Sequence, residues 1–439
     1  MSNIVEKELA MNKIILSIFI VSALLSSSVK ADEVLTWEDC AQEALQKHPE
    51  LIVATEKVAE AKANKNISKS SMLPQIDAGL SGKRTQTSSK NTAGEYVEKY
   101  NNTFAYSISA QQLVFDGFKT SSDVSSALKT LQAEGYNYLL TSSDIRLSLR
   151  SAFVELLRAQ ELVPLTEDIE KRRKQNYELV KLRYEAGREH KGSLLTAKAD
   201  LANAEFEVDQ AIRNITLAQR ELSKELGFAE LRSVSVKDEF ELSDDYRDNP
   251  SLEELADTTP FLRQLIAKKE VARFDLNSKK ADFLPKVYLN VSAGRTNDDW
   301  PPKHDEWSAG FSVSLPLFEG GSRVSEVSKA KSQLRQAEAT ERSGRDSVLV
   351  TLEETWKDLQ DAIDYVSVQK QFLEAAKERA KITRAQYETG LTSFDDWIVI
   401  EDNLVTAEKA YLNAQANMLI SESYWIQAIG GTLEYENKK

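Results

Sequence analysis

Side chains capable of acid–base, nucleophilic or metal chemistry do not form a recognisable catalytic group in this sequence. The histidines, His48, His190 and His304, lie far apart, and none belongs to a cluster of His, Cys and Asp residues at metal-ligand spacing. Cys40 has no histidine partner and stands in a helix-opening stretch, so we expect a small buried side chain. The stretch "GREHKGS" beginning at Gly187 imitates a phosphate loop but lacks its lysine and a preceding strand. The sequence therefore predicts a protein that is not an enzyme and uses no cofactor and no metal.

Composition narrows the class of partner. The formal net charge of -13 disfavours nucleic acid, because phosphate binding requires basic patches. The hydrophobic content of 41% with 28% charged residues is typical of a folded chain. A mean hydropathy of -0.43 argues against a bundle of membrane-spanning helices, and past the N-terminus no apolar run reaches the ~18 residues that a spanning helix needs.

The first 31 residues have the pattern of a secretory signal peptide. From Met11, Lys13 gives the positive region, residues 14–25 the apolar region, and Ala31 ends a small-x-small cleavage site. A membrane anchor is the alternative, although the apolar region is short for a span. Whether translation starts at Met1 or Met11 is left open. With one cysteine and no internal disulfide, we expect an exported protein of a bacterial periplasm or outer membrane.

The chain is an internal duplication. Pro74 and Pro285 are 211 residues apart and open similar segments, "LPQIDAGLSG" and "LPKVYLNVSAG". Downstream the offset falls to 203 and stays constant, from "FDG" and "FEG" to "YEAG" at Tyr184 and "YETG" at Tyr387. We place the copies at 32–228 and 251–431, joined by a linker at 229–250 and followed by a tail at 432–439. The difference of eight residues predicts a longer loop in the first copy.

Each copy has the same predicted order of elements. A helix capped by Thr36 with Asp39, or Ser251 with Glu254, is followed by a second helix that ends at the proline. A β-hairpin, a very long helix and a closing helix come next. The long helices are roughly 100 Å at 1.5 Å per residue, which is typical of coiled coils, and Pro164 is expected to kink the first. The predicted hairpins cover about 75–115 and 286–318, the long helices 119–185 and 322–388, and the closing helices 193–226 and 396–429.

The stretch "WSAGFSVSLPLFEGG" at 307–321 alternates apolar with small or polar residues, as a strand with two unlike faces does. Three other segments of about ten residues repeat the pattern. A soluble sheet packed on helices is one explanation, but its free face usually carries Lys and Glu. The small, uncharged second face and the length favour a transmembrane β-barrel. Residues expected to face lipid include Ile108, Trp307, Phe311, Val313 and Leu315.

Four strands cannot close a barrel, and an open edge in lipid leaves backbone groups unpaired. Several copies of the chain must therefore share one barrel. Two chains would give eight strands with a filled interior, whereas three would give twelve with room for a pore. Geometry excludes a monomer and leaves the number open.

The doubled motifs, together with "TWEDCAQEALQKHPEL" at 36–51, resemble the TolC family of outer-membrane efflux proteins over residues 34–432. The resemblance implies a mainly α-helical homotrimer with a shared twelve-stranded barrel in outer-membrane lipid and a long helical tunnel through the periplasm. It implies the exit duct of a tripartite efflux or type I secretion system in a Gram-negative bacterium. The expected partners are a periplasmic adaptor and an inner-membrane pump of the RND, ABC or MFS type.

The resemblance also assigns roles to particular residues. Phe115, Gly117, Phe318 and Gly320 would mark the change from strand to helix. Asp395 and Asp396 would ring the periplasmic entrance and favour cations, the alternative being carboxylates that stabilise a helix start. Tyr387 matches a tyrosine that holds the entrance closed in the family. The expected adaptor-contacting tips are Gly187, Gly390, Leu391 and Thr392.

Two departures from the family pattern concern the entrance. Ser193 stands where an acid is expected, and Thr392 stands where the best-known members have Arg, so the family's latch is not carried over unchanged. The first tip, "AGREHKG", is basic and longer than "TGLT", which predicts a different adaptor preference. A periplasmic adaptor and a structural coiled-coil protein remain the alternative functions. The sequence identifies neither the cargo nor the resting state of the entrance.

Overall fold

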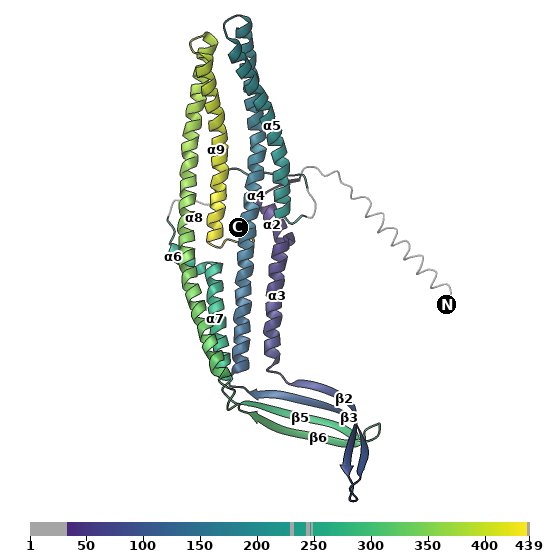
Figure 1. Cartoon of the computed structure of the whole chain (residues 1–439). Helices are drawn as coiled ribbons and strands as arrows, with labels where there is room; N and C mark the ends of the chain where they lie inside the picture. The colour runs from purple at the N-terminus through teal and green to yellow at the C-terminus, as the bar shows by residue number, and fades with distance from the viewer. Residues whose placement is uncertain (1–32, 229–231, 243–245, 247–248, 437–439) are drawn as a thin grey trace, which may run out of the picture.

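The computed structural model describes residues 33–228, 232–242, 246 and 249–436. The predicted signal peptide at 1–31 lies outside the described residues. The chain forms a long column of helices, with two helical hairpin tips at one end and a four-stranded sheet at the other (Figure 1). Among the described residues, no helix is both long and apolar enough to cross a membrane.

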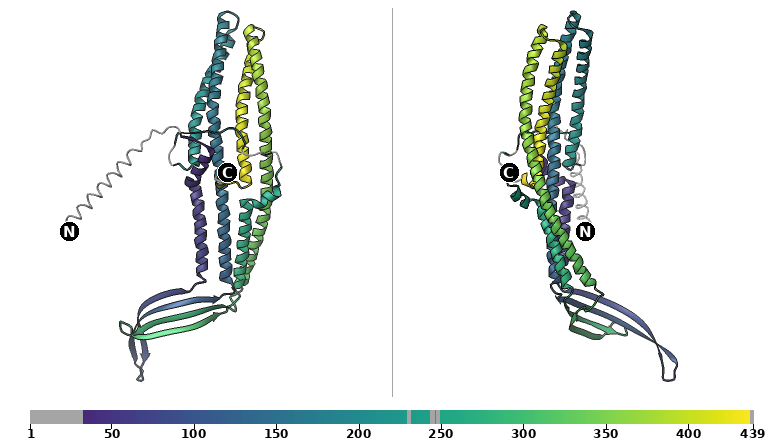
Figure 2. Two further views of the ribbon diagram at one scale, coloured as in Figure 1. Left: turned by 180° about the vertical axis from the view of Figure 1, so that it is seen from behind. Right: turned by 60° about the vertical axis from the view of Figure 1, so that its left-hand side comes forward.

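The helices repeat in two sets. The first contains α2, α3, α4 and α5, and the second contains α6, α7, α8 and α9. In both sets the long helix, α4 or α8, runs the whole height of the column. Its strand end packs against the shorter α3 or α7, and its tip end packs against α5 or α9 (Figures 1 and 2). The bounds are α2 Trp37–Lys47, α3 Pro49–Ser70, α4 Lys119–Glu185, α5 Lys191–Glu225, α6 Leu252–Thr258, α7 Pro260–Ala281, α8 Ser322–Thr389, α9 Phe394–Ala428 and α10 Leu433–Glu436.

Helix starts agree with the predictions in part. Thr36 accepts from the Asp39 backbone N–H, and the Asp39 carboxylate accepts from the Thr36 backbone, which confirms the capping box of α2. Ser251 is the N-cap of α6, but its side chain makes no capping hydrogen bond, so the second predicted box is wrong. Pro164, which is expected to kink the first long helix, lies inside α4, and the helix continues through it.

The four strands form one antiparallel sheet in the order β2-β3-β5-β6. The inner strands, β3 and β5, come from different copies, and β2 and β6 are left as open edges. Strand lengths correct a prediction: β2 (Gln75–Lys90) and β3 (Tyr96–Phe115) have 16 and 20 residues, whereas β5 (Lys286–Asn297) and β6 (His304–Ser314) have 12 and 11. The extra residues of the first copy thus extend its strands instead of its loop, because their pairing continues from Gly82–Phe104 to Lys90–Tyr96.

A two-stranded parallel sheet lies near mid-height and was not predicted. It pairs β1 (Glu33–Leu35) with β4 (Val234–Val236), so it ties the start of the described chain to the predicted linker. The Gln160 side chain of α4 both donates to the Val236 carbonyl and accepts from its N–H, each at 2.8 Å. The linker is therefore attached to the column through its backbone. Such hydrogen bonds do not depend on a periodic pattern of apolar side chains, so the sequence gives no sign of them.

Candidate functional site

One face of the four-stranded sheet is small and polar, and hydrogen bonds cross its strands. Gln111 of β3 donates to the Asn290 side chain at 2.9 Å, and Asn290 of β5 donates to Ser312 of β6 at 3.0 Å. Ser292 and Ser308 are bonded at 2.9 Å. Because side chains of directly paired residues lie on the same face, these contacts fix the register of β3, β5 and β6. The side chains on this face are hydrophilic and mostly small, as is suitable for the wall of an aqueous passage.

The opposite face is apolar and open. Trp307 is 81% exposed and Phe311 73% exposed, and Ile108 and Val313 are exposed beside them. An apolar face of this extent in one chain requires lipid or another protein to cover it. Leu315 was expected among these residues, but β6 ends at Ser314, so Leu315 lies beyond the strand although it too is exposed.

The change from strand to helix occurs at the glycine motifs. In the first copy, the Asp116 carboxylate accepts from the Thr120 backbone N–H at 2.8 Å and so caps the start of α4. Gly117 has φ +72, and its Cα lies so close to the second copy that an added Cβ would stand 2.7 Å from Leu284. Gly320 has φ +62, but nothing lies within 4 Å of an added Cβ. Phe318, expected to mark the second junction, is an exposed side chain.

Replacing Gly117 with Ala should therefore destabilise the protein more than replacing Gly320 with Ala. Both substitutions carry about 1–2 kcal/mol of left-handed backbone strain, but only Gly117→Ala adds a clash with Leu284. We expect a lower thermal unfolding temperature for Gly117→Ala, measured on the detergent-extracted protein. Equal temperatures for the two variants would show that the close approach to Leu284 does not matter.

Tyr387 is the centre of an aromatic cluster near the hairpin tips. It is fully buried and stacks on Trp397 of α9 with ring centroids 4.3 Å apart. Phe394, Val180 and Ala197 complete the cluster, so it joins α4 and α5 to α8 and α9. Tyr387, which the resemblance assigns to the closed entrance, is therefore packed between the two copies.

The acid partner of Tyr387 comes from a position that the sequence analysis did not single out. The Tyr387 hydroxyl donates to Glu189 Oε2 at 2.9 Å. Ser193, which stands at the expected acid position, donates to the other oxygen of Glu189 at 2.9 Å. On the α4 side, Arg183 donates to the Tyr387 carbonyl at 2.6 Å, and its guanidinium lies 4.5 Å from the tyrosine ring centre. Glu189 belongs to the short turn before α5, where spacing from the glycine alone could not show which side chain reaches Tyr387.

The hydrogen bonds perturb both ionisable groups. Burial opposes ionisation of Glu189, but the bonds from Tyr387, Ser193 and the His190 backbone outweigh it and hold the pKa of Glu189 below its usual value. Burial, with the hydrogen bond to Glu189, raises the pKa of Tyr387. The pair is therefore a neutral phenol bonded to a carboxylate at neutral pH.

The other predicted tip residues lie around this cluster but outside it. Asp395 and Asp396 are exposed in the first turn of α9. Asp396 has a capping role, since the Ser393 hydroxyl donates to its carboxylate at 2.6 Å and its own N–H donates back to Ser393 at 3.1 Å. Leu391 is 80% exposed. The first turn, 186–190, is one residue longer than the second, 390–393, as the sequence predicts. Gly187 lies in the first turn, and Gly390, Leu391 and Thr392 lie in the second.

Ion pairs whose arginines are largely buried connect the two copies below the tips, although the Asp402 side chain is 57% exposed. Arg172 of α4 donates through Nη1 to Glu408 of α9 at 2.8 Å, and the Glu408 side chain is 9% exposed. The next residue, Arg173, donates to Asp402 of α9. These pairs cross between helices about 230 residues apart in the chain, so neither could be found from sequence spacing.

Replacing Glu408 with Ala should destabilise the protein by about 3 kcal/mol, because it leaves the Arg172 guanidinium without its closest carboxylate. The value is at the lower end of the usual range since Asp168 lies 3.7 Å from Arg172. The double variant Arg172→Met with Glu408→Leu should come within about 1 kcal/mol of the parent protein. Chemical denaturation of the three proteins measures both differences, and an equally destabilised double variant would contradict this account.

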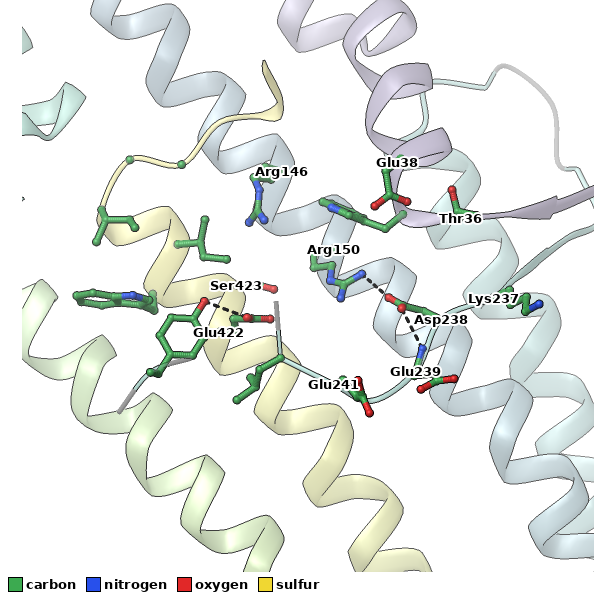
Figure 3. A pocket seen from close by; sticks show the side chains of 18 residues that line it. Thr36, Glu38, Arg146, Arg150, Lys237, Asp238, Glu239, Glu241, Glu422 and Ser423 are labelled. Carbon is green, nitrogen blue, oxygen red and sulfur yellow. Dashed lines mark hydrogen bonds and ion pairs between the residues drawn. The ribbon is translucent and has the colours of Figure 1, made fainter. Parts of the chain in front are cut away.

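A cavity of about 830 Å³ lies near mid-height between α2, α4, α9 and the linker (Figure 3). Two hydrogen bonds cross its wall: Arg150 donates to Asp238 at 2.9 Å, and Tyr246 donates to Glu422 at 2.9 Å. Arg150 also lies 4.9 Å from the ring of Trp37. The bonds of Arg150 and Tyr246 join the linker to the column.

Cys40, His48 and His190, which were considered above as candidates for chemistry, have roles in packing and helix capping. Cys40 is fully buried, and burial raises its pKa to about 12, so its thiol is unreactive. His48 and His190 cap the starts of α3 and α5 by accepting backbone N–H groups at 3.3 and 3.2 Å. Within the ranges that the structure describes, no group of three or more His, Cys, Asp or Glu residues could hold a metal ion.

Comparison with known proteins identifies this architecture. The sequence profile of the family described as "Outer membrane efflux protein" matches residues 40–227 and 252–431. The outer membrane protein TolC of Vibrio cholerae is 23% identical over 446 residues, which cover 97% of each chain. TolC of Escherichia coli is 21% identical over 89% of this chain and 81% of its own.

Solved structures agree in fold. The outer membrane protein VceC of Vibrio cholerae superposes with a TM-score of 0.80 over 90% of this chain and 96% of that chain, at 21% identity. The MtrE outer membrane channel of Neisseria gonorrhoeae, solved in its open state, has a TM-score of 0.79 at 18% identity, covering 93% of this chain and 94% of that one. With both halves of the chain matched, this protein belongs to the outer membrane efflux protein family.

Proposed function

We propose that three copies of this chain form an outer-membrane exit duct, which passes substrates from an inner-membrane pump to the exterior. The observation that carries the proposal is the four-stranded sheet, which has one apolar face, one small polar face and two open edges. In lipid, β2 of one copy must pair with β6 of the next. Three copies give twelve strands, enough for an aqueous pore, whereas two give eight strands with a filled interior.

The native mass of the protein extracted from outer membranes in detergent tests this assembly. We expect three chains per particle and, after reconstitution, ion conduction across a planar bilayer. A water-soluble monomer would overturn the proposal and favour a periplasmic adaptor or a structural coiled coil. The division into copies at 32–228 and 251–431, with a linker at 229–250, is part of the same proposal.

The hairpin tips are proposed as the contact with a periplasmic adaptor, through Gly187, Gly390, Leu391 and Thr392. The exposed Leu391 supports this, because an apolar side chain at a turn has no partner within the described chain. The longer, basic turn at 186–190 would make the two tips unequal. Site-specific cross-linking from position 391 or 188 to adaptor proteins tests the contact, and cross-links from neither tip would contradict it.

Asp395 and Asp396 are proposed to form a ring of carboxylates at the periplasmic entrance. Three exposed pairs around one axis would concentrate cations. Changing both to Asn should move the reversal potential of the reconstituted channel toward that of a non-selective pore, while Asn at 396 retains a capping side chain. The control is Glu205→Gln, an exposed carboxylate of α5. An unchanged reversal potential in the double variant would leave these residues as helix-start carboxylates only.

Tyr387 and Glu189 are proposed to hold the entrance closed. Their hydrogen bond joins the turn of the first hairpin, α4 with α5, to the end of α8 in the second hairpin, α8 with α9. Arg183 of α4 adds a second polar contact between the hairpins, because it donates to the Tyr387 carbonyl at 2.6 Å.

A further inference from the structure

Buried polar atoms without a hydrogen bond gather where the two hairpins meet. In the part of the chain that the structure describes, several side-chain atoms of the tip half of α4 and α5 are buried and have no hydrogen bond. Such atoms are rare in native proteins and call for an explanation, since each has lost its hydration without a replacement. They are Arg172 Nε, Arg173 Nη1, Asn176 Nδ2 and Oδ1, Arg183 Nε and Asp200 Oδ2.

Arg173 shares a cavity with two carboxylates that belong to different hairpins. It is 7% exposed and donates through Nη2 to Asp402 of α9, across the seam between the hairpins. Asp200 is on α5, in the same hairpin as Arg173, and its Oδ2 is buried without a donor. All three residues line one cavity of about 520 Å³ between α4, α5 and α9. Burial raises the pKa of Asp200, and the charge of Arg173 opposes that rise, so the two groups are within electrostatic reach.

The neighbouring arginine has a related arrangement, in which the carboxylate of its own hairpin is exposed. Arg172 is bonded across the seam to Glu408 of α9, and Asp168 of its own helix lies 3.7 Å away. Each arginine therefore has one bonded carboxylate on the other hairpin and a second carboxylate on its own. A single static interface would need only the first, because a buried guanidinium with one bonded carboxylate already has its charge compensated.

The consequence appears when the hairpins move apart. Separation removes Asp402 and Glu408 from the arginines, and an unpaired buried cation opposes that motion strongly. A carboxylate that stays with the arginine on the same hairpin reduces this opposition. The unused Nη1 of Arg173 and the unused Oδ2 of Asp200 are the donor and the acceptor that such a replacement bond requires.

We propose that Arg173 exchanges partners as the duct opens: it pairs with Asp402 when the hairpins are together, as here, and with Asp200 when α9 moves away. Arg172 exchanges Glu408 for Asp168 in the same step. The inference rests on the proposed duct and identifies the charges that balance its closed and open forms. It assigns opposite roles to two carboxylates that line the same cavity: Asp402 stabilises the closed form and Asp200 the open form.

The test is single-channel recording of the reconstituted protein at neutral pH. Asp402→Asn removes the partner of the closed form, so the fraction of time spent open should rise by roughly three- to tenfold. Asp200→Asn removes the partner of the open form, so the open fraction should fall by a similar factor. In an Arg173→Met background both effects should vanish. Asp209→Asn, at an exposed position of α5, is the matched control and should change nothing.

The outcomes separate the alternatives. If both variants move the open fraction in the same direction, or neither moves it, Arg173 does not exchange partners. Thermal unfolding of each trimer accompanies the recordings, because a merely destabilised protein would lower the unfolding temperature in both variants without opposite gating effects. A parent protein that does not conduct at all would instead overturn the proposed function.

Discussion

Replacing Phe311 with Arg should prevent assembly of the trimer in the outer membrane. Phe311 is exposed on the apolar face of β6, directly opposite Leu289 of β5. An arginine on the lipid-facing side of a barrel costs about 2–4 kcal/mol near the bilayer midplane, and the trimer would contain three of them. The measurement is the amount of trimer in outer-membrane extracts, judged by native mass.

Ser312→Arg is the matched control for this variant. Ser312 is the next residue of the same strand, and its side chain accepts from Asn290 on the polar face. An arginine there would project into the aqueous interior, so we expect normal assembly and a reduced conductance. If Phe311→Arg assembles as well as Ser312→Arg, the apolar face does not contact lipid, and the barrel must be reconsidered.

Removing the hydrogen bond between Tyr387 and Glu189 should open the entrance. Tyr387→Phe keeps the stacking on Trp397 and loses only the hydroxyl. A hydrogen bond to a charged carboxylate contributes about 1.5 kcal/mol or more, so its loss in all three copies should raise the ratio of open to closed channels roughly 1,000-fold. Glu189→Gln should act in the same direction with a smaller effect, because an amide oxygen still accepts. Conductance in planar bilayers measures both.

Tyr184→Phe is the control, since Tyr184 is the counterpart of Tyr387 in the first copy and is partly exposed. The effect of pH has a definite sign. The pKa of Glu189 is below its usual value of 4.5, so its contribution is fully present above that value and is lost as pH falls through the lowered pKa. Acidification of the periplasmic side below about pH 4.5 should open the parent channel more than Glu189→Gln. Equal responses would assign the acid effect to other carboxylates.

The two copies of the duplication contain the same elements but make different contacts. Both copies supply a hairpin of strands and a hairpin of helices, but the contacts between copies are unequal. At the strand end, Gly117 of the first copy approaches Leu284 of the second, while Gly320 has open space. At the tip, Tyr387 of the second copy is buried, while Tyr184 of the first is partly exposed. Equivalent positions in the repeat therefore need different tests.

The sequence by itself determined the repeat, the long helices and the two unlike faces of the strands. These features are local: a strand's alternation and a helix's spacing of three and four are written in consecutive residues, and a constant offset records the duplication. The long helix predicted at 119–185 is α4. Cys40 as a small buried residue and the capping box at Thr36 follow from the same local rules.

Only the tertiary structure decided which side chains meet. Glu189 instead of position 193 reaches Tyr387, and Arg172 and Arg173 face Glu408 and Asp402 across the seam. Such pairings depend on the relative height and rotation of helices joined through hundreds of residues, and a shift of one residue in a turn changes them. The length of the first β-hairpin was decided in the same way, because polar residues such as those at 84–102 extend a strand only when a partner strand continues beside them.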